Sequence, residues 1–295
     1  HVGNEGTPDA NGFVLTADGK RLVKFTNTTA TEVVVPDGVE VIGDSAFLSN
    51  TTITKVTLPA SIKSVESYAF NGCTSLETVL GCENLEKVGN YAFSGTKIAG
   101  IDLSNVTSMG DYAFYNCKSL TEVTFQQDKN AMINMLQGTF KGCTSLTKIT
   151  LPSIGALASR LATIGGTFEG CTRLQEVIFT GDCTNIGATA FRSCINLTSI
   201  TMPSSVASIG YRAFYGCTAL SEVNFAGGIE AIPEEAFYGC TSLTSMELPD
   251  FVSSIGKNAF YGCTSLTDFT FGAGVVTVEE KAFYNAAALT NVTWN

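Results

Sequence analysis

Histidine is almost absent from this sequence of 295 residues, since the only one, His1, stands at the very start. Histidine is the usual general base, the usual partner of a catalytic nucleophile and a common zinc ligand. We also find no phosphate-binding loop, no nucleophile elbow and no histidine-anchored metal motif. The sequence therefore predicts a protein that is not an enzyme and that carries no cofactor or metal.

Positive charge is also scarce, with 17 lysine and arginine residues against 27 aspartate and glutamate residues and a net charge of −10. Nucleic acid and anionic membranes both require a basic surface, so neither is an expected partner. No apolar run approaches the roughly 20 residues that span a bilayer, and we expect no membrane insertion. No signal peptide is visible in the polar start, and we expect that it has been removed from this sequence.

What the sequence does contain is a repeat. A phenylalanine, preceded by alanine or threonine, recurs eleven times at a dominant spacing of 23 residues. Such a fixed period is the signature of a repeat architecture in which stacked units share one core. The recurring residues are Phe47, Phe70, Phe93, Phe114, Phe140, Phe168, Phe191, Phe214, Phe237, Phe260 and Phe283.

Each repeat predicts one strand and one tight turn. Residues 197–202 alternate apolar and polar side chains, which indicates a short strand, and a proline often follows and ends it. Glycine or asparagine usually stands two residues after the phenylalanine and predicts a left-handed turn there. The remainder reads as a short irregular or one-turn helical return. Stacked strands would form a parallel sheet that rises by about 4.8 Å per turn.

The domain organisation follows from where the repeat begins. We expect an unstructured start at residues 1–11 and a β-hairpin at residues 12–35, with its turn at Asp18-Gly19, that caps the core. Residues 36–295 form the array of about eleven repeats. Because no polar capping unit follows the last strand, we expect the natural chain to continue past Asn295 or this end to meet a partner.

The repeat resembles that of the BspA-like leucine-rich repeat family of bacterial, and some protozoan, surface proteins. Residues 255–266, with the sequence IGKNAFYGCTSL, follow the family pattern closely, and the resemblance extends over about residues 30–295. It implies an α/β-type repeat solenoid: a right-handed leucine-rich-repeat coil with a parallel β-sheet on its concave face and short irregular or 3-10 returns on its convex face. It also implies adhesion to extracellular-matrix or cell-surface partners.

We therefore expect a non-catalytic, adhesin-like binding module, located at the cell surface or secreted. It would recognise a host or matrix protein or a glycan through the solenoid surface. The alternative is a structural spacer that displays or anchors another domain.

The outward positions of the predicted strands form the first candidate site, a concave ligand-binding face. Their acidic members would form a stripe that favours a basic protein segment. The alternative is a solvated sheet face whose threonines serve β-propensity. The candidate residues are Glu122, Thr124, Lys148, Glu176, Ser199, Glu222, Asn224, Glu247 and Asp268.

Tyrosines that directly follow the repeated phenylalanine form the second candidate site, an aromatic stripe. Their rings could stack on sugars or on a protein partner, or they could pack on one another along the coil. The residues are Tyr115, Tyr215, Tyr238, Tyr261 and Tyr284. The longer turns at residues 126–136 and 153–166 are a third candidate, as loops that carry function or tolerate drift.

Eight of the ten cysteines occupy one column, three residues after the phenylalanine. Side chains of one column point in parallel, whereas a disulfide needs Cβ atoms turned toward each other, so we expect no disulfides. The preferred interpretation is a ladder of buried thiols that act as small apolar groups, and a metal site is the alternative. Cys82 and Cys183 lie outside the column, and we expect Cys183 to belong to the core.

Overall fold

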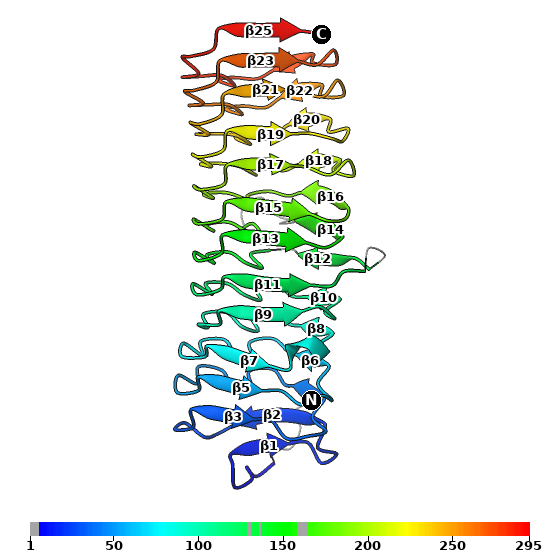
Figure 1. The fold of residues 1–295 in the computed structure, drawn as a ribbon, viewed down its shortest axis with the longest axis vertical. Coiled ribbons are helices and arrows are strands. Elements are labelled where there is room, and N and C mark those ends of the chain that lie inside the picture. The colour runs from blue at the N-terminus through cyan, green and yellow to red at the C-terminus, as the bar shows by residue number, and fades with distance from the viewer. Residues whose placement is uncertain (1–5, 129–130, 136, 158–164) are drawn as a thin grey trace. The chain divides into compact units, whose positions relative to one another are not determined.

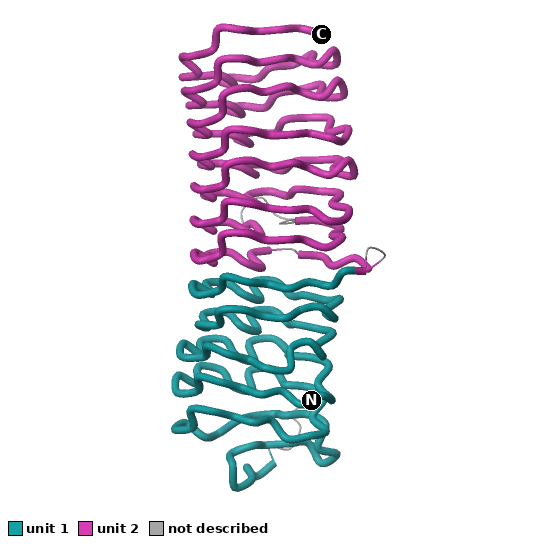
Figure 2. The backbone as a smooth tube through the Cα atoms, viewed as in Figure 1, with its two compact units in different colours: residues 1–127 teal, residues 128–295 magenta. Residues whose placement is uncertain are grey.

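The computed structural model describes residues 6–128, 131–135, 137–157 and 165–295. The chain divides into two compact units, residues 1–127 and residues 128–295, which are described separately (Figure 2). Nearly all elements are short strands. The only helix within the described residues is the three-residue 3-10 helix η1 (Cys82–Asn84). The architecture is thus a parallel-strand β-solenoid, and the described residues do not support the α/β label.

In the first unit the strands form three sheets, with the orders β1-β2-β4-β6-β8-β10, β3-β5-β7 and β9-β11 (Figure 1). All pairs are parallel except β1 with β2, which form an antiparallel hairpin. The strands are β1 (Phe13–Leu15), β2 (Arg21–Phe25), β3 (Glu32–Val34), β4 (Val41–Ile42), β5 (Lys55–Thr57), β6 (Ser64–Val65), β7 (Thr78–Leu80), β8 (Lys87–Val88), β9 (Gly100–Leu103), β10 (Ser108–Met109) and β11 (Glu122–Phe125).

In the second unit all strand pairs are parallel, in sheets of order β12-β14-β16-β18, β13-β15, β17-β19, β20-β22-β24 and β21-β23-β25. The strands are β12 (Ile133–Met135), β13 (Lys148–Leu151), β14 (Ile154–Leu157), β15 (Glu176–Phe179), β16 (Cys183–Ile186), β17 (Ser199–Thr201), β18 (Ser208–Ile209), β19 (Glu222–Asn224), β20 (Ala231–Ile232), β21 (Ser245–Glu247), β22 (Ser254–Ile255), β23 (Asp268–Phe271), β24 (Thr277–Val278) and β25 (Asn291–Trp294).

The return segment of most turns contains a second strand, where the sequence predicted only an irregular or one-turn helical connection. Within each unit of Figure 1 the strands stack in two rows. The odd-numbered strands from β3 onward have three or four residues each, and we call them the longer strands; the even-numbered strands, most of which have two residues, we call the shorter strands. In β22, Ile255 is buried and Ser254 is partly exposed, as in an ordinary half-buried strand. Two residues are too few for the alternation to be recognised in a sequence.

The repeated phenylalanines form the core. In the first unit the rings of Phe47, Phe70, Phe93 and Phe114 stack with centroids 4.8, 5.3 and 5.4 Å apart. In the second unit, rings from Phe140 to Phe283 stack at 5.3–5.5 Å. These distances are close to the roughly 4.8 Å step between strands, so each turn adds one ring to the stack. No single turn could bury its ring alone.

Two left-handed residues flank the phenylalanine in most turns. The predicted one, two residues after it, has a positive φ at the glycines and at Asn116 and Asn285. It also has a positive φ at Ser49 and Ser193, which are neither glycine nor asparagine. The other, two residues before the phenylalanine, was not predicted because its residue types are mixed. It comprises Ser45, Tyr68, Tyr91, Tyr112, Gly138, Thr189, Arg212, Glu235, Asn258 and Lys281.

The left-handed residues allow a third hydrogen-bonded row on the side of the coil where the described residues form no strands. The amides of Tyr68, Phe70 and Gly72 donate to carbonyls of the next turn at 2.8, 2.8 and 2.9 Å. Alternating left- and right-handed residues turn every second N–H toward the neighbouring turn. A left-handed L-residue costs roughly 1–2 kcal/mol, and an inter-turn hydrogen bond of about 1 kcal/mol offsets part of that.

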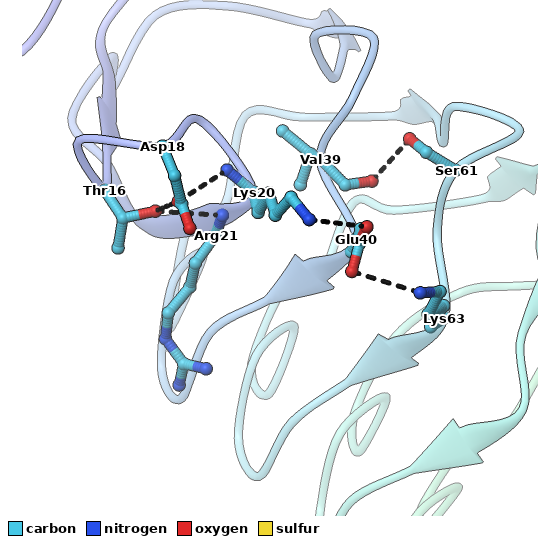
Figure 3. Close-up of polar contacts among 8 residues, drawn as sticks. All are labelled: Thr16, Asp18, Lys20, Arg21, Val39, Glu40, Ser61 and Lys63. Carbon is cyan, nitrogen blue, oxygen red and sulfur yellow. Dashed lines mark hydrogen bonds and ion pairs between the residues drawn. The ribbon is translucent and has the colours of Figure 1, made fainter.

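The hairpin is joined to the first repeats by polar contacts (Figure 3). In its turn, Asp18 accepts hydrogen bonds from the Thr16 hydroxyl at 2.7 Å and the Lys20 amide at 3.0 Å. Glu40 forms ion pairs with Lys20 at 3.5 Å and with Lys63, one turn further on, at 3.2 Å. The hydrogen bond from Lys63 lowers the pKa of the Glu40 carboxyl. The pairs are exposed and contribute little stability each.

Among the left-handed residues that the structure describes, Thr189 alone has a β-branched side chain. It has a φ of 57° and is 5% exposed, and its Oγ1 has no hydrogen-bond partner among the described residues. We expect Thr189→Gly to raise the free energy of unfolding by about 1 kcal/mol, because it relieves the backbone strain and removes an unsatisfied hydroxyl. Urea unfolding measures this change.

Thr139→Gly is the matched control. Thr139 is also buried with an unpartnered Oγ1 among the described residues, but its φ is not positive. That variant should be less stable than Thr189→Gly. At a negative φ, glycine relieves no backbone strain and only increases the conformational entropy of the unfolded chain. A Thr189→Gly protein that unfolds at lower urea than the parent would contradict the strain argument.

Candidate binding surface

All nine residues predicted to face outward on the strands do so. They lie on β11, β13, β15, β17, β19, β21 and β23, and each is exposed. Their neighbours in the strands, such as Ile149, Ile200 and Met246, are buried. We call this outward surface of the longer strands the strand face. Its side chains project from hydrogen-bonded strands, which fixes their spacing within each unit.

The predicted acidic stripe is interrupted. Glu176 pairs in register with Lys148, and the two side chains form an ion pair at 3.4 Å. Glu222 is in register with Ser199, and Asp268 lies between Ser245 and Asn291. Hydroxyl, amide or ammonium groups therefore separate the carboxylates along the strand face.

Two small hydrogen-bond networks order polar groups on this face. The Asn224 amide group donates to Thr201 Oγ1 at 3.3 Å and to Glu222 Oε1 at 3.0 Å. Asp268 accepts from the Thr267 hydroxyl at 2.6 Å and the Asn291 amide at 2.7 Å. These hydrogen bonds, from Thr267 first and then Asn291, lower the pKa of Asp268.

A shallow hollow of about 540 Å³ opens where β19 and β21 end and their turns begin. It is lined by residues 223–228 and 247–251, and we call it the strand-end hollow. It brings together two of the predicted residues, Asn224 and Glu247, with Asp250 and Phe251, which the sequence analysis did not select. Phe251 is 74% exposed. It could have been found as the one aromatic residue in a turn column that otherwise holds small or polar residues.

The tyrosine stripe packs on itself in the second unit. The rings of Tyr215, Tyr238, Tyr261 and Tyr284 are stacked in sequence, with centroids 4.7, 4.6 and 4.9 Å apart. Each inner ring has a neighbour on both faces, so only edges and hydroxyls remain for a ligand. This geometry supports the interpretation as an internal ladder.

The first unit contains a different tyrosine ladder, two residues before the phenylalanine. Tyr68, Tyr91 and Tyr112 stack at 5.1 and 4.9 Å. Tyr115, the predicted member of the stripe, contacts Tyr112 edge-on at 5.5 Å. The sequence analysis missed this ladder because tyrosine occupies the position two residues before the phenylalanine in only three turns.

Arginines contact the end of the second-unit tyrosine ladder. The Arg212 guanidinium lies 4.8 Å from the centroid of Tyr211 and 5.0 Å from that of Tyr215, and its Nε is 3.0 Å from Glu235. Burial opposes the charge of Arg212, but the hydrogen bond to Glu235 prevails and raises the pKa of the guanidinium. The Arg212 cation therefore already has aromatic rings and a carboxylate as partners within the chain.

The sequence predicted that the two longer turns form loops, but each of them also contains a strand. Residues 126–136 include β12 and residues 153–166 include β14, both of which continue the row of shorter strands. Residues 129–130, 136 and 158–164 lie outside the described residues.

The cysteine ladder is confirmed. All ten cysteines are buried thiols rather than disulfides, and Cys183 belongs to the core as expected. Among the residues that the structure describes, no group of three or more histidine, cysteine or acidic residues is arranged to hold a metal ion.

The thiols also donate hydrogen bonds, which the sequence analysis did not anticipate. Sγ of Cys73 and Cys217 lies 3.1 Å from the phenylalanine carbonyl of the preceding turn, and Cys263 does the same at 3.3 Å. The column therefore selects a small side chain that is apolar enough for the core and still able to donate.

These observations define a leucine-rich-repeat-like solenoid. The family model for the BspA type leucine rich repeat region matches residues 23–147, 137–233 and 163–290, in six copies. The chain therefore belongs to the BspA-type leucine-rich repeat family. No protein with a curated description shows significant sequence similarity to it.

Solved structures of bacterial proteins share the fold. A leucine-rich repeat protein from Bacteroides ovatus is 26% identical, with a TM-score of 0.56, over 98% of this chain and 87% of the other. A leucine-rich cell surface protein from Faecalibacterium prausnitzii is 25% identical, with a TM-score of 0.51, over 98% and 94% of the two chains. The pneumococcal vaccine antigen PcpA, at 18% identity and a TM-score of 0.55 over 98% and 87%, shares the fold alone. Within the described residues no helix has the length and apolar character needed to cross a bilayer.

The buried thiols predict that the protein loses stability in alkali. Burial raises the pKa of Cys73, Cys171, Cys217 and Cys263 from 9.0 to about 12. In the unfolded chain these thiols ionise at their ordinary pKa, so above it the unfolded state binds fewer protons. The stabilisation is complete below pH 9 and falls as the pH rises toward 12.

Denaturant unfolding between pH 8 and pH 11 would measure this effect. Each Cys→Ala substitution in the column, for example Cys217→Ala, should reduce the slope of the unfolding free energy against pH by up to about 1.4 kcal/mol per pH unit. Cys217→Ser is a control that removes the ionisable group but keeps a donor. An unfolding free energy that stays constant up to pH 11 would contradict the prediction.

Proposed function

We propose that the protein is a non-catalytic binding module, secreted or exposed at the cell surface, that recognises an extracellular protein or glycan through its strand face. The observation that carries this proposal is a row of exposed, chiefly polar side chains on the longer strands of each unit, which Val34 and Leu80 interrupt in the first unit. Family membership and the cell surface protein of Faecalibacterium prausnitzii support the location.

The physical advantage of such a surface is its rigidity. Its side chains include serine, threonine and asparagine beside the carboxylates, and each of the longer strands beneath them pairs with at least one neighbouring strand, β5 and β23 with two. A partner that binds there orders few rotatable bonds, which reduces the entropic cost of association. We further propose that the strand face is the concave face of the coil, as in other leucine-rich repeat proteins.

The alternative function is a structural spacer that displays another domain. Repeated inter-turn hydrogen bonds along each unit would suit that role, because they resist bending. A spacer, however, requires no particular set of exposed groups on one row of strands, so the two functions differ in what a surface substitution does.

We expect the purified chain to bind at least one component of a panel of extracellular-matrix proteins and glycans. Charge reversal on the strand face, by Glu222→Lys or Glu247→Lys, should weaken that binding by at least fivefold through the loss of complementary charge. Surface plasmon resonance at fixed salt measures it.

Glu280→Lys is the matched control, because Glu280 is exposed but lies on the turn side of the coil. It should leave binding unchanged. If no component of the panel binds, recognition of matrix components is refuted. If all three variants lose the same affinity, the assignment to the strand face is refuted.

The hairpin supports this function by closing the core, and we propose that it acts as a cap. The rings of Phe13 and Phe25 are buried with centroids 5.1 Å apart, and Phe25 lies 5.0 Å from Phe47 of the first repeat. The two hairpin rings thus cover the first ring of the repeated stack. Without them Phe47 would face water.

Substitution tests the cap. Phe25→Ser and Phe13→Ser should each lower the free energy of unfolding by about 3 kcal/mol and increase binding of an apolar dye. Lys24→Ser, an exposed change on the same strand, should have an effect below about 0.5 kcal/mol. Hairpin variants that unfold at the parent denaturant concentration would show that the hairpin is no cap.

A further inference from the structure

The strand-end hollow contains an aromatic residue in an unusual position of the repeat. Phe251 stands fourteen residues after Phe237, and the same position holds Ser61 and Ser205 in other turns. Those serines bind the preceding turn: Ser61 Oγ donates to Val39 O at 2.7 Å, and Ser205 Oγ to the Cys183 carbonyl at 3.1 Å. Phenylalanine cannot form this bond, and its ring extends into solvent instead.

The residues on both sides leave the ring of Phe251 uncovered. The equivalent positions of the two adjacent turns are Gly228 and Gly274. A Cβ atom placed on Gly228 would lie 3.6 Å from the ring, so a side chain there would occupy space beside the aromatic face. With glycine, the space forms part of the hollow. An exposed aromatic face next to an open hollow is a platform on which a ligand can stack.

The polar side chains that line the hollow can only accept hydrogen bonds. Asn224 already donates its amide group to Thr201 and Glu222, which leaves its carbonyl oxygen available. Glu247 and Asp250 carry carboxylates, and the other lining residues have apolar or no side chains. A ligand that fits this set supplies donors and positive charge. A sugar hydroxyl both donates and accepts, and no lining side chain offers it a donor.

The charge around the hollow has one sign. Residues 213–256 contain no lysine or arginine, and neither do the flanking segments 198–206 and 267–275. The acidic residues of residues 213–256 are Glu222, Glu230, Glu234, Glu235, Glu247 and Asp250. Glu235 is paired with Arg212 just outside this segment, and the field of the remaining carboxylates attracts a cation.

We propose that the strand-end hollow binds a lysine or arginine side chain of a basic segment on a partner protein. The cation lies against the face of Phe251, while Glu247, Asp250 and the Asn224 carbonyl accept its hydrogen bonds. The inference rests on the proposed binding function and names the chemistry of the partner at one site. It also gives a role to the exposed ring, which stands at a position where serine binds the preceding turn in two other repeats.

Fluorescence anisotropy of the full chain with a labelled hexa-arginine peptide tests the proposal. Phe251→Leu keeps an apolar side chain but removes the π face, and Glu247→Gln removes one charge from the lining. Each should weaken peptide binding about fivefold, from the loss of one cation contact. Glu86→Gln is the matched control: it removes the same charge from an exposed glutamate that lies outside the strand face, directly before β8 in the other unit, and it should change the affinity by less than about twofold.

Three results would overturn the inference. The first is no peptide binding at low salt. The second is equal losses in Glu86→Gln and Glu247→Gln, which indicate diffuse attraction. The third is displacement of the peptide from the hollow by a neutral hexasaccharide that binds more tightly. The outcomes remain separable from the proposed function. A panel protein bound equally by the parent, Phe251→Leu and Glu247→Gln would keep the binding function and refute the hollow. Site-dependent peptide binding with a silent panel would keep the hollow and refute matrix recognition.

Discussion

The backbone hydrogen bond between one turn and the next is the interaction on which the rest of the structure depends. Two rows of short strands form it in the ordinary extended conformation. On the remaining side of the coil, left-handed residues on both sides of the phenylalanine turn alternate amides toward the next turn. Because all three sides are paired between turns, each residue meets its own equivalent about 4.8 Å away, and like side chains form columns.

This constraint explains which residue types the columns accept. A planar ring stacks on its own copy, as the phenylalanines and tyrosines do. A carboxylate faces repulsion from its own copy, and on the strand face Glu176, Glu222 and Asp268 are each in register with a residue that is not acidic. A thiol satisfies two demands, since it fills the core and donates to the carbonyl of the preceding turn. The same logic that favours aromatic columns therefore prevents a continuous acidic stripe.

Much of the fold was predictable from sequence, because a column repeated eleven times averages out local noise. The period predicted the solenoid, and the glycine column predicted one left-handed position. Because the cysteines of one column point in parallel, the sequence also predicted that they form no disulfides with one another. The second strand row was missed because pairs such as Ser254–Ile255 are too short to show alternation. The second left-handed column was missed because residues as different as Thr189 and Arg212 occupy it, so inter-turn bonding overrides local preference there. The hollow depends on three neighbouring turns at once, which no single repeat reveals.

Recognition in such a regular structure requires a departure from the repeat. A perfectly periodic surface offers the same contacts at every turn, so a ligand could bind in many registers and none would be specific. Phe251, between Gly228 and Gly274, makes one turn different from its neighbours. It lies at the ends of β19 and β21, where the inter-turn hydrogen bonds of the strands no longer restrict the type of side chain. The strands then provide a rigid base, and the turn at their ends provides the difference that selects one register. In the proposed site, specificity lies in the turn columns, where substitutions leave the inter-turn pairing of the strands unchanged.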